Sequence, residues 1–226
     1  MLVKRIANFN DPSSLASHMR ARRFALFRSL VEKLPSGARL LDIGGTPDFW
    51  RDIDLVADGR LRVTLLNLES YTPVRPEVKL IRGDARDMVA FPDQSFDAVF
   101  SNSVIEHVGS FTDQQRMAIE VRRVAPRYFI QTPNRYFPLE PHFLLPMFQF
   151  YPLALRIALV RRHQLGWMPM RPSYEEARRE VSQIRLISAS EMLKLFPDAK
   201  LYRERFYGLT KSLVAYGGWE AAGSSE

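Results

Sequence analysis

The sequence predicts an α/β protein with a doubly wound β-sheet covered by helices on both faces. Short aliphatic runs alternate along the chain with longer segments of helical periodicity. This alternation is typical of parallel strands joined by helical crossovers. Several of the runs end in glycine or a polar residue, as strands do where such a sheet meets a ligand crevice. We expect residues 1–226 to form a single domain, which their number permits.

The composition excludes several kinds of chemistry. The chain has no cysteine, which rules out a disulfide framework, a thiolate nucleophile and a cysteine-bound metal. With only four histidines, we expect no zinc site and no other metal. The net charge of +7 favours contact with phosphates, anionic lipid or an acidic glycan, although a solvated basic surface explains it equally well.

From the first residues we expect no export signal. Residues 1–5 run straight into polar residues rather than an apolar segment, so we expect a cytoplasmic protein. Residues 1–12 are predicted to be an arm that orders on docking. At the other end, residues 221–226 are predicted to be disordered.

A glycine turn follows the first predicted strand. The apolar run Leu40–Ile43 leads into Gly44 and Gly45, and then into Thr46 and Pro47, where a helix can begin. Glycines in such a turn let the backbone approach a ligand closely. From these residues alone, a nucleotide-like ligand and an ordinary strand-to-helix turn both remain open.

Further strands are predicted at 61–69, 78–85, 96–100, 127–132, 199–207 and 211–216. In a doubly wound sheet the carboxyl ends of adjacent parallel strands face one crevice, so Asn67 and Glu69 should reach the same place as Asp42. Glu69 is the natural candidate to hold two ribose hydroxyls, because a carboxylate can accept from both. The alternative is that Asn67 and Glu69 simply begin a loop.

Helices are predicted where apolar residues recur at helical spacing. Residues 13–34 form an amphipathic N-terminal helix. Residues 112–115 fit a capping box at the start of a helix that ends at Pro126, and residues 188–191 fit another before a shorter helix.

Three blocks of sequence follow one another in a characteristic order. They are LLDIGG at 40–45, VTLLNLE at 63–69 and GDARDMVAFPDQSFDAVFSNSVIEHV at 83–108. Together they resemble class I S-adenosylmethionine-dependent methyltransferases, especially the small-molecule, type 11-like branch, and the third block is the most specific. The resemblance implies a seven-stranded, mostly parallel sheet of order 3-2-1-4-5-7-6 with strand 7 antiparallel. It also implies a helical lid insertion after strand 5.

The resemblance further implies a site for S-adenosylmethionine, whose product is S-adenosylhomocysteine. The implied contact residues are Asp42, Gly44, Gly45, Thr46, Asn67, Leu68, Glu69, Asp84, Ala85, Asn102 and Ser103. Asp42 and Gly44 would line the methionine portion, and residues 67–69 would face the ribose. Asp84 would accept a hydrogen bond from the adenine amino group. Asn102 and Ser103 would lie near the sulfonium.

The sequence departs from the family pattern in two places, the first loop and the end of the second strand. Thr46 and Asp48 stand where the family usually has further glycines, and Asn67 replaces the acid expected at the end of the second strand. A bulkier loop would crowd the methionine end and weaken cofactor binding. A non-catalytic cofactor- or ligand-binding module with the same fold is therefore an alternative.

Two histidines are candidates for catalysis, His107 after the fourth strand and His142 in the next segment. A sulfonium methyl is already electrophilic, so the enzyme mainly aligns the reactants, while an oxygen nucleophile gains from a general base. A structural hydrogen-bonding role is the alternative for each histidine. Because insertions after the fifth strand commonly shape the acceptor pocket in this family, the resemblance implies acceptor contacts from Asn134, Arg135, Tyr136 and His142.

The predicted insertion, residues 135–180, begins with an aromatic segment that is interrupted by prolines and flanked by arginines. This segment is too broken to span a bilayer, so we expect no transmembrane segment. An apolar lid with arginines suits a small or amphiphilic acceptor, such as a glycan or lipid-linked intermediate, and permits peripheral membrane contact. An extra helical layer or a dimer face is the alternative, which leaves monomer and homodimer open.

These observations predict the transfer of a methyl group from S-adenosylmethionine to a small or amphiphilic non-protein acceptor, at oxygen. The basic charge raises a nucleic-acid methyltransferase as an alternative. Against it, the Asn/Asp-Pro-Pro-aromatic motif of amino-group methylation does not follow the fourth strand, where residues 101–104 read SNSV. We therefore expect no nucleic-acid partner.

Overall fold

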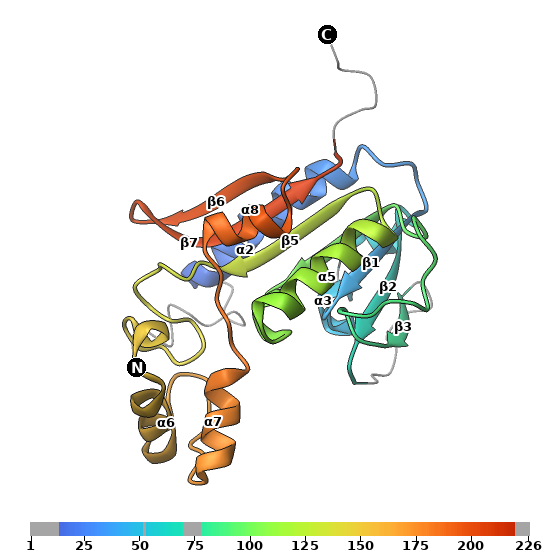
Figure 1. The fold of residues 1–226 in the computed structure, drawn as a ribbon. Helices are drawn as coiled ribbons and strands as arrows, with labels where there is room; N and C mark the ends of the chain where they lie inside the picture. The colour runs from blue at the N-terminus through green and yellow to red at the C-terminus, as the bar shows by residue number, and fades with distance from the viewer. Residues whose placement is uncertain (1–13, 52, 70–77, 220–226) are drawn as a thin grey trace.

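The computed structural model describes residues 14–51, 53–69 and 78–219. The predicted N-terminal arm and the predicted disordered tail lie outside the described residues. The described chain winds around one β-sheet, with a helical insertion at one end of it (Figure 1).

The sheet has seven strands in the order β3-β2-β1-β4-β5-β7-β6, which confirms the predicted topology. The strands are β1 (Ala38–Ile43), β2 (Leu61–Asn67), β3 (Val78–Arg82), β4 (Ala98–Asn102), β5 (Tyr128–Pro133), β6 (Lys200–Phe206) and β7 (Leu209–Gly217). The first five pair in parallel, and β7 runs antiparallel to both of its neighbours. The carboxyl ends of β1 to β5 therefore lie along one edge of the sheet.

One face of the sheet is covered by α2 (Leu15–Val31) and two short helices, α3 (Pro47–Trp50) and α4 (Asp54–Ala57). Ser14 begins α2 by accepting a hydrogen bond from the backbone of Ser17 at 3.1 Å. The apolar side of α2 is buried on the sheet, and the ring of Phe27 lies 4.6 Å from that of Phe100 in β4.

The opposite face is covered by α5 (Phe111–Val124) and α8 (Ala189–Leu195). The capping box predicted for α8 at residues 188–191 is confirmed. The box predicted to begin at Thr112 is wrong by two residues, because Ser110 caps α5 and Asp113 completes the box. Thr112 already lies within the first helical turn, so its side chain cannot act as the cap.

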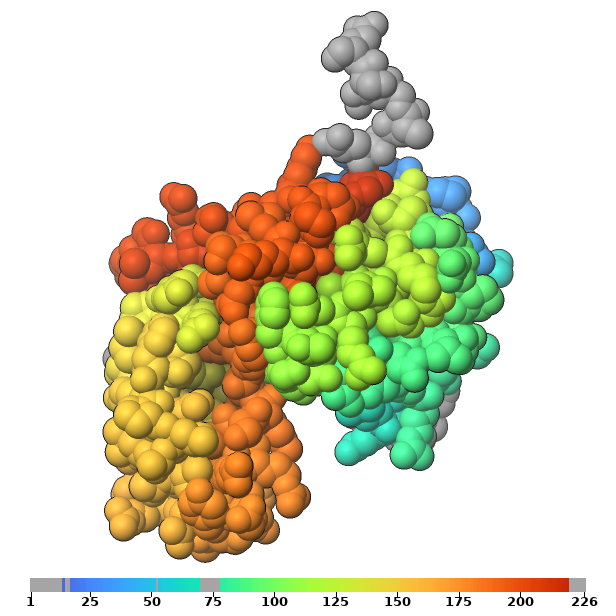
Figure 2. All heavy atoms as spheres, in the orientation of Figure 1, coloured from blue at the N-terminus to red at the C-terminus, as the bar shows by residue number. Residues whose placement is uncertain are grey.

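The segment between β5 and α8 leaves the sheet. It contains η2 (Phe148–Phe150), α6 (Leu153–Arg162) and α7 (Tyr174–Ser182), which bury a small core of their own. Figure 2 shows this segment as a lobe that stands out from the body of the molecule. No helix among the described residues is long and apolar enough to cross a membrane.

Candidate active site

The glycine turn after β1 is built so tightly that neither of its first two residues could carry a side chain without a shift. Gly44 has φ +76°, and a Cβ there would lie 2.4 Å from Cγ2 of Val104. A Cβ on Gly45 would lie 1.7 Å from Oδ2 of Asp42. The turn is thus held between the loop that follows β4 and the last polar side chain of β1.

Asp42 is buried beneath this turn rather than directed into open space. Alternation along β1 places it on the same face of the sheet as Leu40, and there it accepts a hydrogen bond from Nε1 of Trp50 at 2.6 Å. Its other carboxylate oxygen has no hydrogen-bond partner in the described structure. Burial raises the pKa of Asp42 to about 7, with the Trp50 hydrogen bond opposing the rise.

A cleft of about 640 Å³ opens at the carboxyl ends of the first four strands, and we call it the strand-end cleft. It is lined by Ile43, Gly44, Leu66, Asn67, Leu68, Glu69, Gly83, Asp84, Ala85, Arg86, Val104, His107 and Val108. Six of the predicted cofactor residues are therefore brought together here. Five others, Asp42, Gly45, Thr46, Asn102 and Ser103, do not line it.

The end of β2 supplies one side of the strand-end cleft. Asn67 does not point freely into it, because its side-chain amide donates to the backbone oxygen of Gly45 at 2.8 Å. Asn67 thereby ties the end of β2 to the glycine turn. A carboxylate at this position could not donate this hydrogen bond. Glu69 is exposed at the same edge, where its carboxylate is available to a ligand.

The end of β3 carries an ion pair that the sequence analysis missed. The guanidinium of Arg86 binds both carboxylate oxygens of Asp84, with its shortest contact at 2.6 Å, and also donates to the backbone oxygen of Val108. This hydrogen bonding lowers the pKa of Asp84 below its usual value. The carboxylate that was predicted to meet adenine is therefore ionised and shared with Arg86.

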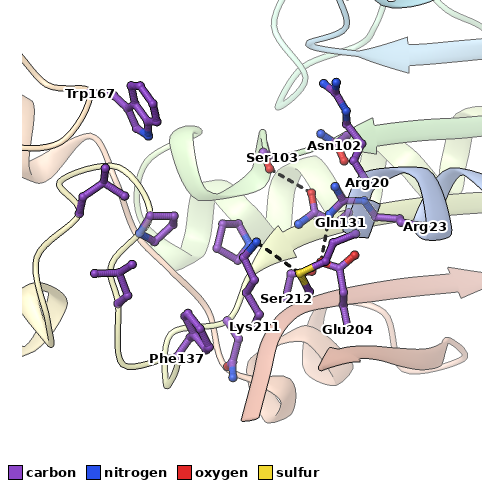
Figure 3. Close-up of a pocket in the computed structure, with 16 residues that line it drawn as sticks. Arg20, Arg23, Asn102, Ser103, Gln131, Phe137, Trp167, Glu204, Lys211 and Ser212 are labelled. Carbon is purple, nitrogen blue, oxygen red and sulfur yellow. Dashed lines mark hydrogen bonds and ion pairs between the residues drawn. The ribbon is translucent and has the colours of Figure 1, made fainter. Parts of the chain in front are cut away.

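A second, more apolar cavity of about 350 Å³ lies on the insertion side of the β4–β5 strand ends, and we call it the insertion-side cavity (Figure 3). It is lined by Met19, Arg20, Arg23, Asn102, Ser103, Gln131, Pro133, Asn134, Phe137, Leu139, Pro141, Leu144, Trp167, Glu204, Lys211 and Ser212. These residues come from α2, the β4–β5 ends, the insertion and the β6–β7 hairpin. The cavity is thus assembled from segments that are distant in the sequence.

The loop after β4 separates the two spaces. Asn102 and Ser103 line the insertion-side cavity, whereas Val104 and His107 line the strand-end cleft. Ser103 has φ +58°, an uncommon conformation for a residue with a side chain, and its hydroxyl donates to the side chain of Gln131 at 3.0 Å. The sharp turn at Ser103 carries the chain from one space to the other.

Of the acceptor residues predicted after β5, only Asn134 lines the insertion-side cavity. Its side-chain amide donates to the backbone oxygen of Thr210 at 2.8 Å, which joins β5 to the β6–β7 hairpin. Arg135 and Tyr136 lie outside both spaces and pack on Phe150, with Tyr136 stacked at a ring distance of 5.9 Å.

The two predicted catalytic histidines meet where the insertion approaches the loop after β4. The rings of His107 and His142 lie 4.9 Å apart, edge to face. Nδ1 of His142 donates to Oε1 of Glu140 at 2.7 Å, so Nε2 is left to act as an acceptor. Glu140, which the sequence analysis missed, also accepts from the backbone of Phe143 at 2.7 Å and is fixed in place.

The surroundings shift the pKa values of the two histidines in opposite directions. Burial opposes a charge on His142, but the hydrogen bond and the negative charge of Glu140, together with that of Glu106, raise its pKa. His107 is exposed at the cleft, yet desolvation by its neighbours and the proximity of His142 lower its pKa.

Glu106 is buried beside the two histidines. One of its oxygens accepts from the hydroxyl of Thr132 at 2.9 Å, while burial raises its pKa to about 7. One ligand atom from each of Glu106, His107 and His142 lies within 4.8 Å of the others, so this group has the composition to hold a metal ion. The sequence analysis expected no metal because the chain has no cysteine and only four histidines.

Comparison with known proteins connects this geometry to a family. Residues 60–127 match the family model described as "Methyltransferase domain". That range begins just before β2 and includes the end of β3, the loop after β4 and α5. This part of the chain is therefore similar to a methyltransferase domain. The predicted resemblance to class I methyltransferases is confirmed by this match and by the strand order.

Relatives of this chain include an uncharacterized protein of Mycobacterium tuberculosis, found in strains H37Rv and CDC 1551. It is 30% identical over 162 residues, which are 67% of this chain and 53% of that protein. The chain therefore spans about half the length of the curated relatives that it matches.

Solved methyltransferases share the fold at low identity. A SAM-dependent methyltransferase from Methanosarcina mazei has a TM-score of 0.55 at 14% identity, covering 84% of this chain and 95% of its own. A 1,6-didemethyltoxoflavin-N1-methyltransferase from Burkholderia thailandensis has a TM-score of 0.51 at 14% identity, covering 88% and 76%. Phosphoethanolamine N-methyltransferase 2 of Haemonchus contortus, solved with S-adenosyl-L-methionine, has a TM-score of 0.51 at 15% identity, covering 81% and 38%.

Proposed function

We propose that this protein transfers a methyl group from S-adenosylmethionine to a small or amphiphilic, non-protein acceptor. The observation that carries the proposal is that one short loop, residues 102–108, lines two adjacent spaces of different character. The strand-end cleft is the more polar and takes the cofactor. The insertion-side cavity takes the acceptor, so that the reacting atoms meet at the loop.

The cofactor assignment follows from the groups at each strand end. Glu69 is exposed where a ribose would lie, and a carboxylate can accept from both ribose hydroxyls. The ionised Asp84 accepts from the adenine amino group while it remains paired with Arg86. Gly44 leaves room for the methionine portion to approach the backbone. A cofactor bound to the Haemonchus enzyme of the same fold supports this assignment.

The accepting atom in this proposal is oxygen. The acceptor hydroxyl, at the end of the cavity beside the loop after β4, gives its proton to Nε2 of His142, which lies against His107 of that loop rather than in the cavity wall. The oxygen of the hydroxyl bonds to the methyl carbon, and the bond between that carbon and sulfur breaks to leave S-adenosylhomocysteine. Glu140 fixes the required tautomer of His142 by accepting from Nδ1. A sulfonium methyl needs no further activation, so alignment and exclusion of water supply most of the rate.

Calorimetric titration with S-adenosylmethionine, and separately with S-adenosylhomocysteine, tests the cofactor half of the proposal. Micromolar binding of both supports it. Binding without methyl transfer to any acceptor of an anionic, neutral and glycan panel would instead indicate the non-catalytic module. Failure of both ligands to bind at millimolar concentration would refute the cofactor assignment.

The exposed surface of the insertion extends the proposal to peripheral membrane contact. Leu153 and Leu155 of α6 are 43% and 45% exposed, and Arg161 and Arg162 follow at the end of the same helix. Apolar and basic side chains together suit an anionic lipid surface. Cosedimentation with anionic but not with neutral vesicles is expected, and Leu155→Glu should abolish it. The matched change Ile119→Glu on α5, where the side chain is also exposed, should not.

A further inference from the structure

We propose that the acceptor carries an anionic group, and that Lys211 and Arg23 bind this group in the insertion-side cavity. The inference rests on the proposed function in one respect, because it takes this cavity to be the acceptor site. It adds the chemical class of the acceptor, an anionic amphiphile, and the residues that would select it.

The charges that line the insertion-side cavity do not balance. Arg23 and Lys211 contribute two cations to the lining, whereas Glu204 is the single carboxylate among its described residues. Glu204 already serves two partners, since it lies 3.7 Å from the guanidinium of Arg23 and accepts from the hydroxyl of Ser212 at 2.6 Å. One acid therefore faces two cations in the same cavity.

Lys211 is the cation least well matched by its surroundings. Its Nζ contacts the sulfur of Met19 at 3.6 Å, and no carboxylate of the described residues lies within ion-pair distance of it. Desolvation lowers the pKa of Lys211, the negative charge of Glu204 opposes this shift, and the positive charge of Arg23 adds to it. Such a group is costly to bury alone, and an anionic ligand group would supply the missing partner.

Arg23 provides a fixed second contact. It is only 7% exposed and is held in place by Glu204, which is itself 5% exposed. A guanidinium can bind a phosphate or carboxylate through two parallel hydrogen bonds, whereas Lys211 acts as a point charge. The two side chains come from α2 and β7 and enter the same cavity, as Figure 3 shows.

The rest of the wall suits an apolar portion of the same molecule. The apolar lining residues are Met19, Phe137, Leu139, Pro141, Leu144 and Trp167. All of them except Met19 belong to the insertion, residues 135–180. Asn102 and Ser103 line the same space beside the strand-end cleft, so the reacting group lies at that end. The charged group, the apolar part and the methyl-accepting atom of the acceptor would thus bind at separate places in one cavity.

Binding of matched single-chain amphiphiles tests the inference without requiring the natural acceptor. Octyl phosphate, octanoate and the uncharged octyl glucoside are titrated into the full chain below their micellar concentrations, with calorimetry as the readout. We expect each anionic probe to bind at least about tenfold more tightly than octyl glucoside, the size of effect that a charged hydrogen bond contributes. The tighter of the two anions identifies whether the site prefers phosphate or carboxylate.

Lys211→Met keeps the length and apolar stem of the side chain while removing the charge. This variant should lose the preference for anionic probes, keep its affinity for octyl glucoside and keep its affinity for S-adenosylmethionine. Lys194→Met, at an exposed position on α8, is the control and should change none of these.

Equal binding of charged and uncharged probes to the unaltered protein would overturn the inference. So would an anion preference that survives in Lys211→Met. Binding of S-adenosylmethionine is measured in the same samples. If the unaltered protein does not bind it, that result counts against the proposed function. The preference of the cavity for anionic probes is a separate measurement and is not decided by it.

Discussion

The strand-end cleft and the insertion-side cavity are neighbours, but they are built in different ways. The cleft is formed by the ends of β1 to β4 and the loops that follow them, all within residues 43–108. The cavity takes residues from α2, β4, β5, the insertion and β7, which span residues 19–212. The strand-end cleft is formed by neighbouring strands of the parallel sheet, whereas the insertion-side cavity depends on segments from the whole chain.

The same difference separates the part of the chain that matches the family model from the part that does not. The cleft lies largely within the range that matches the family model, whereas most of the cavity lies outside it. A common cofactor needs one kind of cleft, while acceptors differ and need different cavities. We therefore expect changes at the cleft to affect cofactor binding, and changes at the cavity or at the histidines to affect turnover.

His142→Gln should give the largest effect, because it removes the proposed base while leaving the cleft intact. Loss of a general base lowers turnover by about 10²- to 10⁴-fold. Steady-state kinetics should show this fall with unchanged affinity for S-adenosylmethionine. His163→Gln, in an exposed position after α6, is the control. Unchanged turnover in His142→Gln would remove this residue from the mechanism.

Gly45→Ala should damage the cleft instead. The added methyl would lie 1.7 Å from the buried carboxylate of Asp42, so either the turn or the Asp42–Trp50 hydrogen bond must move. We expect a loss of about 1 to 3 kcal/mol in the free energy of unfolding, as for other overpacked sites, together with weaker cofactor binding. Gly59→Ala, where no atom lies within 4 Å, should leave cofactor affinity unchanged. Equal cofactor affinities in the two variants would contradict the role of the turn.

Asp84→Ala should weaken cofactor binding by about 1 to 3 kcal/mol, through the loss of a hydrogen bond that involves a charged group. Calorimetry measures the effect directly, and the exposed Asp58→Ala is the control. An unchanged affinity would show that Asp84 serves only to hold Arg86.

Glu140→Gln should shift the pH dependence of turnover. His142 accepts a proton only when it is uncharged, so turnover rises with pH through its pKa. Glu140 raises that pKa, and its replacement should move the rising limb to lower pH. The pH profile of kcat is the measurement, with Glu175→Gln on the exposed part of α7 as control. An unmoved limb would mean that His142 is not the titrating base.

Removal of metal ions should have the smallest effect. The proposed transfer needs only Nε2 of His142, although Glu106, His107 and His142 have the composition to hold an ion. Turnover after dialysis against a chelator should therefore equal that of the untreated protein. A loss that is restored by added zinc would assign these three residues to a metal instead.

Much of this fold could be predicted because its signals are local. The aliphatic run of β1, the glycines after it and the capping box at Ser188 each act within a few residues. The error at Thr112 arose because two candidate caps stand two residues apart, and the choice between them depends on where α5 meets the preceding loop.

The sequence by itself determined the strand order, the location of the strand-end cleft and six of the cofactor residues on its wall. It did not determine the direction of individual side chains. The side chain of Asp42 lies beneath the glycine turn because strand alternation places it beside Trp50. The side chain of Asn67 is hydrogen-bonded to the backbone oxygen of Gly45. Only the tertiary structure brought Lys211 into a cavity with Arg23, since residues so far apart in the chain meet only when the sheet and its helices have packed.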